Sequence, residues 1–303
     1  MKYCEPLASV ESRRIIKKLL IGRYAAYLSE GSDGYTKLLG VINRIFHAYR
    51  RFRYNRLYEK FVYNNIEYID KTSWNIKQMP KIAIYTCIVG DYDTIKEPIF
   101  VSEDCDYYIV TDKDVPLNST WHKIDISSIN ETLKIDDPAL KNRWVKMHPH
   151  ILFPDYDFTI YVDGSILITS DLIPLVLNMN EEMFLGLHVH PFRKTIYREA
   201  EALVTLGKIN DVNLLKKQIL KYRQEGFTSQ MPLFEATVIV SRVKCELCKS
   251  FYEAWWDETM QYVHRDQISL PYVLWKNKIS RDRIEILGDN ILLNSRFILE
   301  KHK

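Results

Sequence analysis

From about residue 80 onward, short apolar runs rich in β-branched and aromatic residues alternate with segments of helical periodicity. The first run, 81–89, is almost continuously apolar, which is typical of a strand buried on both faces and therefore of a parallel sheet. Alternation of strands and helices predicts an α/β fold with a mostly parallel sheet flanked by helices. Strands are expected at 81–89, 107–111, 121–126, 158–162, 184–190 and 236–240, and helices at 138–148, just after 170–171, and at 194–225, 244–262 and 266–277, with a strand or irregular tail at 283–303.

The first 78 residues have a different pattern. Apolar and aromatic residues recur there at spacings of three and four, and no proline occurs between 9 and 63, which predicts two or three helices. Residues 1–80 hold 15 Lys and Arg against 7 Asp and Glu. We therefore divide the chain into a basic helical extension, 1–78, and an α/β domain, 79–303. The extension suits a solvated helix face, an anionic membrane surface or a partner helix, and no nucleic-acid-binding module accompanies it.

Composition narrows the class of protein. The 303 residues are 47% hydrophobic and 27% charged, as expected for a globular chain that needs no disulfide or metal to fold. Five scattered cysteines, with one isolated CxxC at 245–248, indicate reduced thiols in the cytosol. Neither a signal peptide nor an apolar run of about 18 residues is evident, so we expect a cytoplasmic protein, peripheral at most on the inner membrane face. The 20 tyrosines suit carbohydrate-binding surfaces.

Three of the predicted strands end in polar residues: Gly90-Asp91, Asp112, and Asp163-Gly164-Ser165. Because ligands of such sheets bind beyond the carboxyl ends of the strands, these residues are expected along one rim. Neither GxGxxG nor GxxxxGK[ST] occurs, which argues against a glycine-rich dinucleotide site and a P-loop. A carboxylate at the end of a strand can hold a divalent cation that neutralises a departing diphosphate, although Asp-Gly-Ser is also common in ordinary turns.

The order of several motifs resembles one family, the TOD/MUCI glycosyltransferase-like domain, once a domain of unknown function, over about residues 81–279. The resemblance implies a GT-A-like, Rossmann-like fold that binds nucleotide sugars. The motifs that carry it are Tyr85-Thr-Cys-Ile-Val-Gly-Asp-Tyr-Asp93, Tyr107-Tyr-Ile-Val-Thr-Asp112, Lys141-Asn-Arg-Trp-Val-Lys146 with His148-Pro149, Tyr161-Val-Asp-Gly-Ser165, His190-Pro191 with Ile196-Tyr-Arg-Glu-Ala200, and Arg265-Asp-Gln267.

On the donor side, the resemblance implies that Thr86, Gly90, Asp91 and Asp112 hold the nucleoside. A UDP-sugar is the favoured donor. Gly90-Asp91 also fits an ordinary turn.

Arg143 and Lys146 are three residues apart on a predicted helix, so they can face one diphosphate, or they can be solvated charges. His188 and His190 alternate on a strand and therefore share a face, where they line the pocket for donor or acceptor or simply pack.

The resemblance also supplies metal and catalytic candidates. Asp163 corresponds to the DxD position of GT-A enzymes, with Ser165 as its third residue, and together they are expected to hold Mn²⁺ or Mg²⁺. The departure from a strict DxD puts metal dependence in question. Asp266 and Gln267 match an Asp-Gln pair that acts on the acceptor, and Glu199 matches an acidic position of the family. Without the resemblance, Asp266 is also a favourable charge at a helix N-terminus.

These features predict a transferase that moves a sugar from a nucleotide-diphosphate sugar to a glycan or lipid-linked acceptor in the synthesis of a surface polysaccharide of capsule or lipopolysaccharide type. Two alternatives stay open. One is a catalytically inactive GT-A-like scaffold that binds partners through 1–78. The other is a nucleotidyltransferase, which normally has a glycine-rich phosphate loop that is not seen here.

Overall fold

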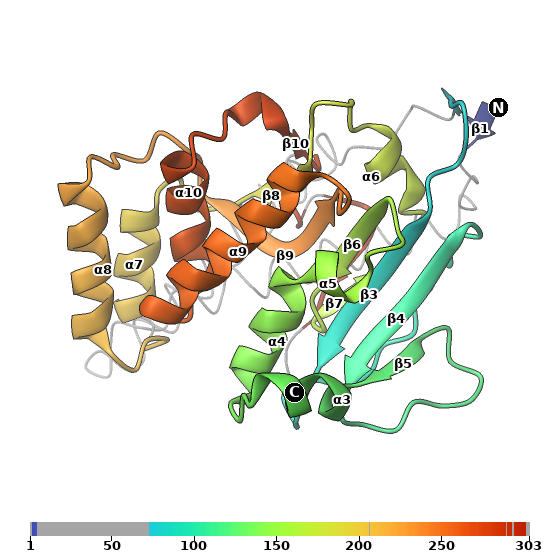
Figure 1. Ribbon diagram of the computed structural model, residues 1–303, viewed down its shortest axis with the longest axis horizontal. Helices are drawn as coiled ribbons and strands as arrows, with labels where there is room; N and C mark the ends of the chain where they lie inside the picture. The colour runs from blue at the N-terminus through green and yellow to red at the C-terminus, as the bar shows by residue number, and fades with distance from the viewer. Residues whose placement is uncertain (1, 5–72, 206, 289, 293, 301–303) are drawn as a thin grey trace, which may run out of the picture.

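The computed structural model describes residues 2–4, 73–205, 207–288, 290–292 and 294–300. Its centre is a seven-stranded sheet in the order β10-β8-β9-β6-β3-β4-β5 (Figure 1). Only β9 runs antiparallel to its two neighbours, so the predicted mostly parallel α/β architecture is confirmed. The strands are β3 (Ile82–Ile88), β4 (Cys105–Thr111), β5 (His122–Asp125), β6 (Phe158–Val162), β8 (Leu185–Val189), β9 (Phe234–Ser241) and β10 (Ile284–Ile286).

Both faces of this sheet are covered. Every residue of β3 is buried, as its continuous apolar sequence predicts for a central parallel strand. One face packs on α4 (Pro138–Met147), α9 (Glu246–Gln261) and α10 (Asp266–Lys276). The other face packs on α6 (Ile173–Leu177) and a two-stranded sheet of β7 (Ile166–Ile168) and β11 (Phe297–Leu299). Other elements include β1 (Lys2–Cys4), which pairs with β2 (Ser73–Asn75), α3 (Ile126–Leu133), α5 (Pro149–Leu152) and η1 (Arg281–Arg283).

The segment predicted to be helical over 194–225 forms two helices, α7 (Ile196–Thr205) and α8 (Val212–Gln224), with a break between them. Gly207 has a φ of +64°, a conformation that ends helices and that glycine adopts without strain. The Asp211 side chain then accepts a hydrogen bond from the Leu214 amide and caps α8. The predicted cap on α4 is confirmed, since Asp137 accepts from the Ala139 amide and Pro138 opens the helix.

A large bulge shapes the end of β9. Leu187 pairs with Ile239 and the next residue of β8, His188, pairs with Glu235, so residues 236–238 have no partner in β8. The bulged segment turns toward β6 instead, and the Thr237 carbonyl accepts a hydrogen bond of 2.8 Å from the Asp163 amide. The bulge therefore brings the start of β9 beside the carboxyl end of β6.

Gly186 allows close packing in the middle of β8. A Cβ atom there would lie 2.9 Å from Leu287 Cδ2 and 3.1 Å from Val240 Cβ. We expect Gly186→Ala to lower the free energy of unfolding by roughly 2 kcal/mol, within the usual range for overpacking, as measured by urea unfolding. In the Leu287→Ala background the same change should cost less, because one clash is gone. Equal costs in both backgrounds would contradict this account.

The helices predicted within 1–78 lie outside the described residues, apart from the edges at 2–4 and 73–78, so the proposed division at residue 78 stays a prediction. Cys87, Cys105, Cys245 and Cys248 are free thiols, and Cys248 is buried in α9 rather than paired within its CxxC. In the described part of the chain, no helix combines the length and the apolar character that spanning a membrane requires.

Candidate active site

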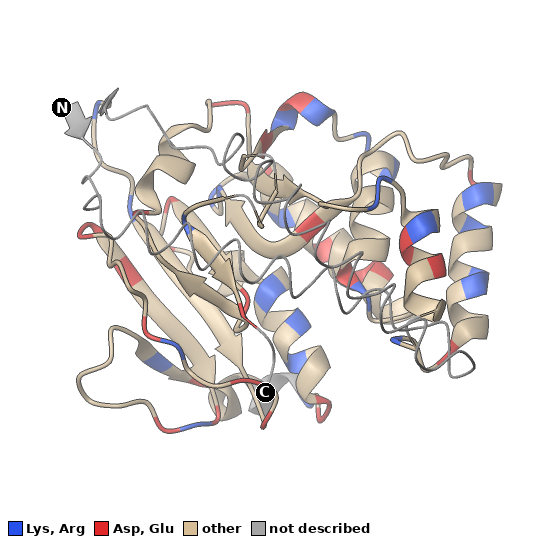
Figure 2. Cartoon of the chain, turned by 180° about the vertical axis from the view of Figure 1, so that it is seen from behind, with Lys and Arg blue, Asp and Glu red and all other residues tan. Residues whose placement is uncertain are grey.

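Helix α4 delivers basic residues to the carboxyl end of the sheet (Figure 2). The Asn142 side chain fixes this helix to β3, because its Nδ2 donates a 2.9 Å hydrogen bond to the Cys87 carbonyl. Tyr85 on β3 donates from its hydroxyl to the Lys146 carbonyl at 3.2 Å. Lys146 and Arg143, one turn apart, consequently face the same place, as their spacing predicts.

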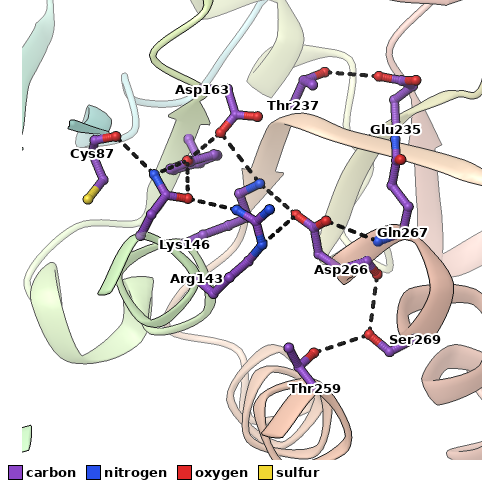
Figure 3. A network of polar contacts seen from close by, with 12 residues as sticks. Cys87, Arg143, Lys146, Asp163, Glu235, Thr237, Thr259, Asp266, Gln267 and Ser269 are labelled. Atoms are coloured by element: carbon purple, nitrogen blue, oxygen red, sulfur yellow. Dashed lines mark hydrogen bonds and ion pairs between the residues drawn. The ribbon is translucent and has the colours of Figure 1, made fainter. Parts of the chain in front are cut away.

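Four charged groups meet at that place (Figure 3). Lys146 Nζ lies 2.7 Å from Asp266 Oδ2 and 3.5 Å from Asp163 Oδ1, and Arg143 Nε lies 3.5 Å from Asp266 Oδ2. The Tyr161 hydroxyl donates a 2.6 Å hydrogen bond to Asp163 Oδ1. Helix α4, the turn after β6 and helix α10 thus contribute to one cluster, which consists of Arg143, Lys146, Asp163 and Asp266.

The pKa of Asp266 reflects this environment. Burial alone would raise the pKa of this carboxyl, but the charges of Arg143 and Lys146 outweigh burial and hold it well below its ordinary value. The side chain also accepts from the Gln267 amide at 3.1 Å, at the N-terminus of α10. Asp266 is therefore an ionised group held in place by two cations, which suits electrostatic positioning better than the uptake of a proton.

A second group of titratable side chains lies beyond Gln267: His190, Arg193, Glu199 and Glu235 (the His190 cluster). His190 Nε2 is 3.4 Å from Glu235 Oε1 and 3.8 Å from Glu199 Oε2, and the Arg193 guanidinium contacts Glu199. The backbone amides of Phe192 and Arg193 donate to His190 Nδ1, both at 3.1 Å. The Arg193 guanidinium also lies 2.8 Å from His190 Nε2, so N–H donors face both nitrogens of the His190 ring.

Burial, reinforced by the charge of Glu199, raises the pKa of Glu235 to about 7. Arg193 and hydrogen bonds from Gln267 and Thr237 act in the opposite direction but do not cancel it. Burial lowers the pKa of His190 to about 3, so the ring is neutral at physiological pH. The His190 cluster therefore contains a carboxyl group able to hold or release a proton near neutral pH, beside the ionised Asp266.

The nucleoside candidates lie at the ends of β3 and β4. The Gly90 amide donates to both carboxylate oxygens of Asp112, at 3.2 and 3.0 Å, which joins the two strand ends directly. Gly90 has a φ of +67°, a conformation that favours glycine. Thr86 is buried, and its hydroxyl has no hydrogen-bond partner in the described part of the chain. Asp91 is exposed at the rim.

Two of the predicted site residues, His188 and Ser165, are buried by packing. The ring of His188 has no exposed surface: it packs edge-on against Phe297, and its Nε2 lies 3.0 Å from Asn294 Nδ2. Burial lowers its pKa to about 3. Ser165 is 2% exposed, and its carbonyl accepts a hydrogen bond from the Glu300 amide. In this structure His188 therefore supports the sheet, and Ser165 belongs to the packed turn.

Sequence reasoning missed four polar residues that the structure adds to the site: Asn142, Arg193, Glu235 and Lys96. Glu235 carried the clearest signal, because it is a carboxyl group inside an otherwise apolar β-rich run, and such a group is seldom buried without partners. Lys96 had none, since it follows β3 in an irregular loop and reaches the Gly164 carbonyl across 68 residues of sequence.

The comparison of sequences places this chain in a glycosyltransferase-like class and makes the family explicit. The chain belongs to the TOD1/MUCI70 glycosyltransferase-like domain family, whose profile matches residues 64–290. It is similar to the alkaline ceramidase TOD1 of Arabidopsis thaliana, with 25% identity over 225 residues, 63% of this chain and 48% of that protein. The chain thus spans about half the length of this relative.

Similar solved structures also come from glycosyltransferases. The apo structure of the bifunctional glycosyltransferase WbbM is 12% identical, with a TM-score of 0.42 over 80% of this chain and 46% of that one. Apo mouse xyloside xylosyltransferase 1 is 10% identical, with a TM-score of 0.43 over 68% and 85% of the two chains. Galactosyltransferase LgtC, solved with donor and acceptor sugar analogues, is 12% identical, with a TM-score of 0.37 over 67% and 72%.

Proposed function

We propose that this glycosyltransferase-like protein transfers a sugar from a nucleotide-diphosphate sugar, a UDP-sugar being favoured, to a glycan or lipid-linked glycan. The observation that carries the proposal is the position of Arg143 and Lys146 at the carboxyl ends of β3, β4 and β6, beside the joined strand ends at Gly90 and Asp112. A diphosphate needs positive charge, and its nucleoside needs backbone and carboxylate partners nearby.

In this proposal each part of the rim has a role. Thr86, Gly90, Asp91 and Asp112 hold the nucleoside. Arg143 contacts the diphosphate, and Lys146 holds Asp163 and Asp266 in position. Gln267 and the His190 cluster, including Glu199, face the acceptor. Synthesis of a surface polysaccharide at the inner membrane face, with 1–78 on anionic lipid, is the setting we propose.

The test uses the full chain and a panel of nucleotide sugars, with calorimetry and donor hydrolysis as readouts. We expect one donor to bind and Arg143→Gln to weaken its affinity by about 10-fold, as expected for losing a charged hydrogen bond. The matched control is Arg198→Gln, an exposed arginine of α7, which should keep wild-type affinity. Ceramide hydrolysis is measured in parallel, because one relative is named an alkaline ceramidase. Ceramide turnover with no nucleotide-sugar binding would overturn the proposal.

A further inference from the structure

The turn Asp163-Gly164-Ser165 is where a divalent cation was expected, but two of its oxygens already contact ammonium groups. Asp163 Oδ1 lies 3.5 Å from Lys146 Nζ and accepts from Tyr161. The Gly164 carbonyl accepts a 2.5 Å hydrogen bond from Lys96 Nζ. The turn thus has lysine ammonium groups bound to a side-chain oxygen and to a main-chain oxygen.

The remaining donors at the turn do not complete a metal site. Mg²⁺ and similar cations take a near-octahedral shell of oxygen ligands, usually with one or two carboxylates from the protein. Two carboxylates lie near the turn, and each is already within 4 Å of a lysine ammonium group: Asp163 at 3.5 Å from Lys146 Nζ and Asp93 at 3.8 Å from Lys96 Nζ. A divalent cation bound to Asp163 would lie within a few ångströms of the Lys146 ammonium group, and the two like charges would repel. The expected Mn²⁺ or Mg²⁺ therefore does not fit Asp163 and Ser165.

Positive charge around the turn comes instead from four residues on three separate segments. Lys96 follows β3, Lys113 follows β4, and Arg143 and Lys146 lie on α4. Lys113 Nζ donates to the Asp93 carbonyl at 2.8 Å, and Lys96 Nζ lies 3.8 Å from Asp93 Oδ1. The side chain of Lys96 is 12% exposed and that of Lys146 is 1% exposed. These cations are already desolvated and held by hydrogen bonds, as preorganised stabilisation of a developing charge requires.

We propose that this protein transfers sugar without a divalent cation, with Lys96 and Arg143 supplying the charge that a metal would supply and Lys146 occupying the metal's place beside Asp163. The inference rests on the proposed function and specifies its chemistry. The bond from the anomeric carbon to the diphosphate oxygen breaks, and its electron pair stays on the diphosphate, next to the fixed cations. The acceptor oxygen forms the new bond to the anomeric carbon and releases its proton to solvent.

The experiment measures nucleoside diphosphate binding to the full chain by calorimetry, first in EDTA and then in Mn²⁺, using UDP and then the other nucleoside diphosphates. We expect the dissociation constants in the two buffers to differ by about threefold at most, which is less than a tenfold change in affinity. Binding only with Mn²⁺ would overturn this inference and leave the proposed function standing. Binding in neither buffer, for any nucleotide, would overturn the proposed function itself.

A lysine variant makes the test specific to the turn. Lys96→Gln is preferred to a change at Lys146, because Lys96 is partly exposed and its loss leaves the packed cluster intact. We expect Lys96→Gln to weaken binding about 10-fold in EDTA and Mn²⁺ to restore part of that loss, since the Gly164 carbonyl is released. The matched control is Lys217→Gln on the exposed face of α8, with wild-type affinity in both buffers. Wild-type affinity of folded Lys96→Gln in EDTA would contradict the proposal.

Discussion

Asp266→Asn is expected to lower the free energy of unfolding by about 3 kcal/mol, measured by urea unfolding at pH 7. The variant keeps the size of the side chain and an acceptor for the Gln267 amide but removes the charge that lies 2.7 Å from Lys146 Nζ. Breaking a buried ion pair from one side usually costs roughly 3–5 kcal/mol, because the remaining charge stays buried. We expect a loss at the lower end of this range, because Asp163 remains 3.5 Å from the same Lys146 ammonium group.

The pH dependence has a definite sign. Arg143 and Lys146 overcome the effect of burial and hold the pKa of Asp266 below its unfolded value of about 3.9. A carboxyl group with a lowered folded pKa adds stability above the unfolded pKa, and that stability is lost as pH falls toward the folded pKa. The difference between wild type and Asp266→Asn should therefore be constant above about pH 5 and shrink below about pH 4.

Two further variants check the cause. Asp257→Asn, on the exposed surface of α9, should stay within about 0.5 kcal/mol of wild type. Adding Lys146→Met to Asp266→Asn removes the unpaired ammonium group, so the double variant should be more stable than the sum of the single changes. Simple additivity of the two changes would show that the ion pair does not determine the loss.

The strands that build the rim were predictable because their environment leaves a strong local signal. A central parallel strand is covered on both faces, so β3 and β6 read as continuous apolar runs that end in polar turns. Asp137-Pro138 likewise fixed the start of α4, and the three-residue spacing of Arg143 and Lys146 placed both on one face. Each of these signals comes from residues that lie close together in the sequence.

The features that sequence reasoning missed depend on contacts between distant segments. The reversal of β9 and its bulge are set by its pairing with both β6 and β8, so nothing within 234–241 indicates that Glu235 lies opposite His188. The alternation of His188 and His190 predicted one shared pocket, but tertiary packing buried His188 against Phe297. Lys96 contacts the Gly164 carbonyl only because the loop after β3 returns over β6.

The structure shifts the pKa values of the two carboxyl groups on either side of Gln267, Asp266 and Glu235, in opposite directions. Asp266 contacts Arg143 and Lys146, which lower its pKa, whereas burial and the neighbouring Glu199 raise the pKa of Glu235 to about 7. Pairs of carboxyl groups with pKa values displaced in opposite directions commonly divide electrostatic and proton-holding roles in active sites. Because its pKa lies near neutral pH, Glu235 is the residue of the His190 cluster whose protonation can be measured most directly.

Glu235→Gln is expected to make the protein more stable than wild type above pH 7. Its pKa of about 7 exceeds the unfolded value of about 4.3, so folding costs free energy once the carboxyl group must ionise. The folded state binds more protons between these two values, and wild-type stability therefore falls as pH rises from about 4.5 to 7. The difference between pKa values of about 7 and about 4.3 corresponds to about 4 kcal/mol, which the neutral glutamine avoids.

Urea unfolding of both proteins at pH 4.5, 6, 7 and 8 measures this difference, which should be near zero at pH 4.5 and largest at pH 8. Glu225→Gln provides a control of opposite sign, because hydrogen bonds from Lys276 and Tyr272 lower the pKa of Glu225. That variant should be less stable than wild type at neutral pH. If Glu235→Gln were also less stable than wild type at pH 8, the folded protein would hold Glu235 ionised, as a partner of Arg193, and the carboxyl group would have no proton to release near pH 7.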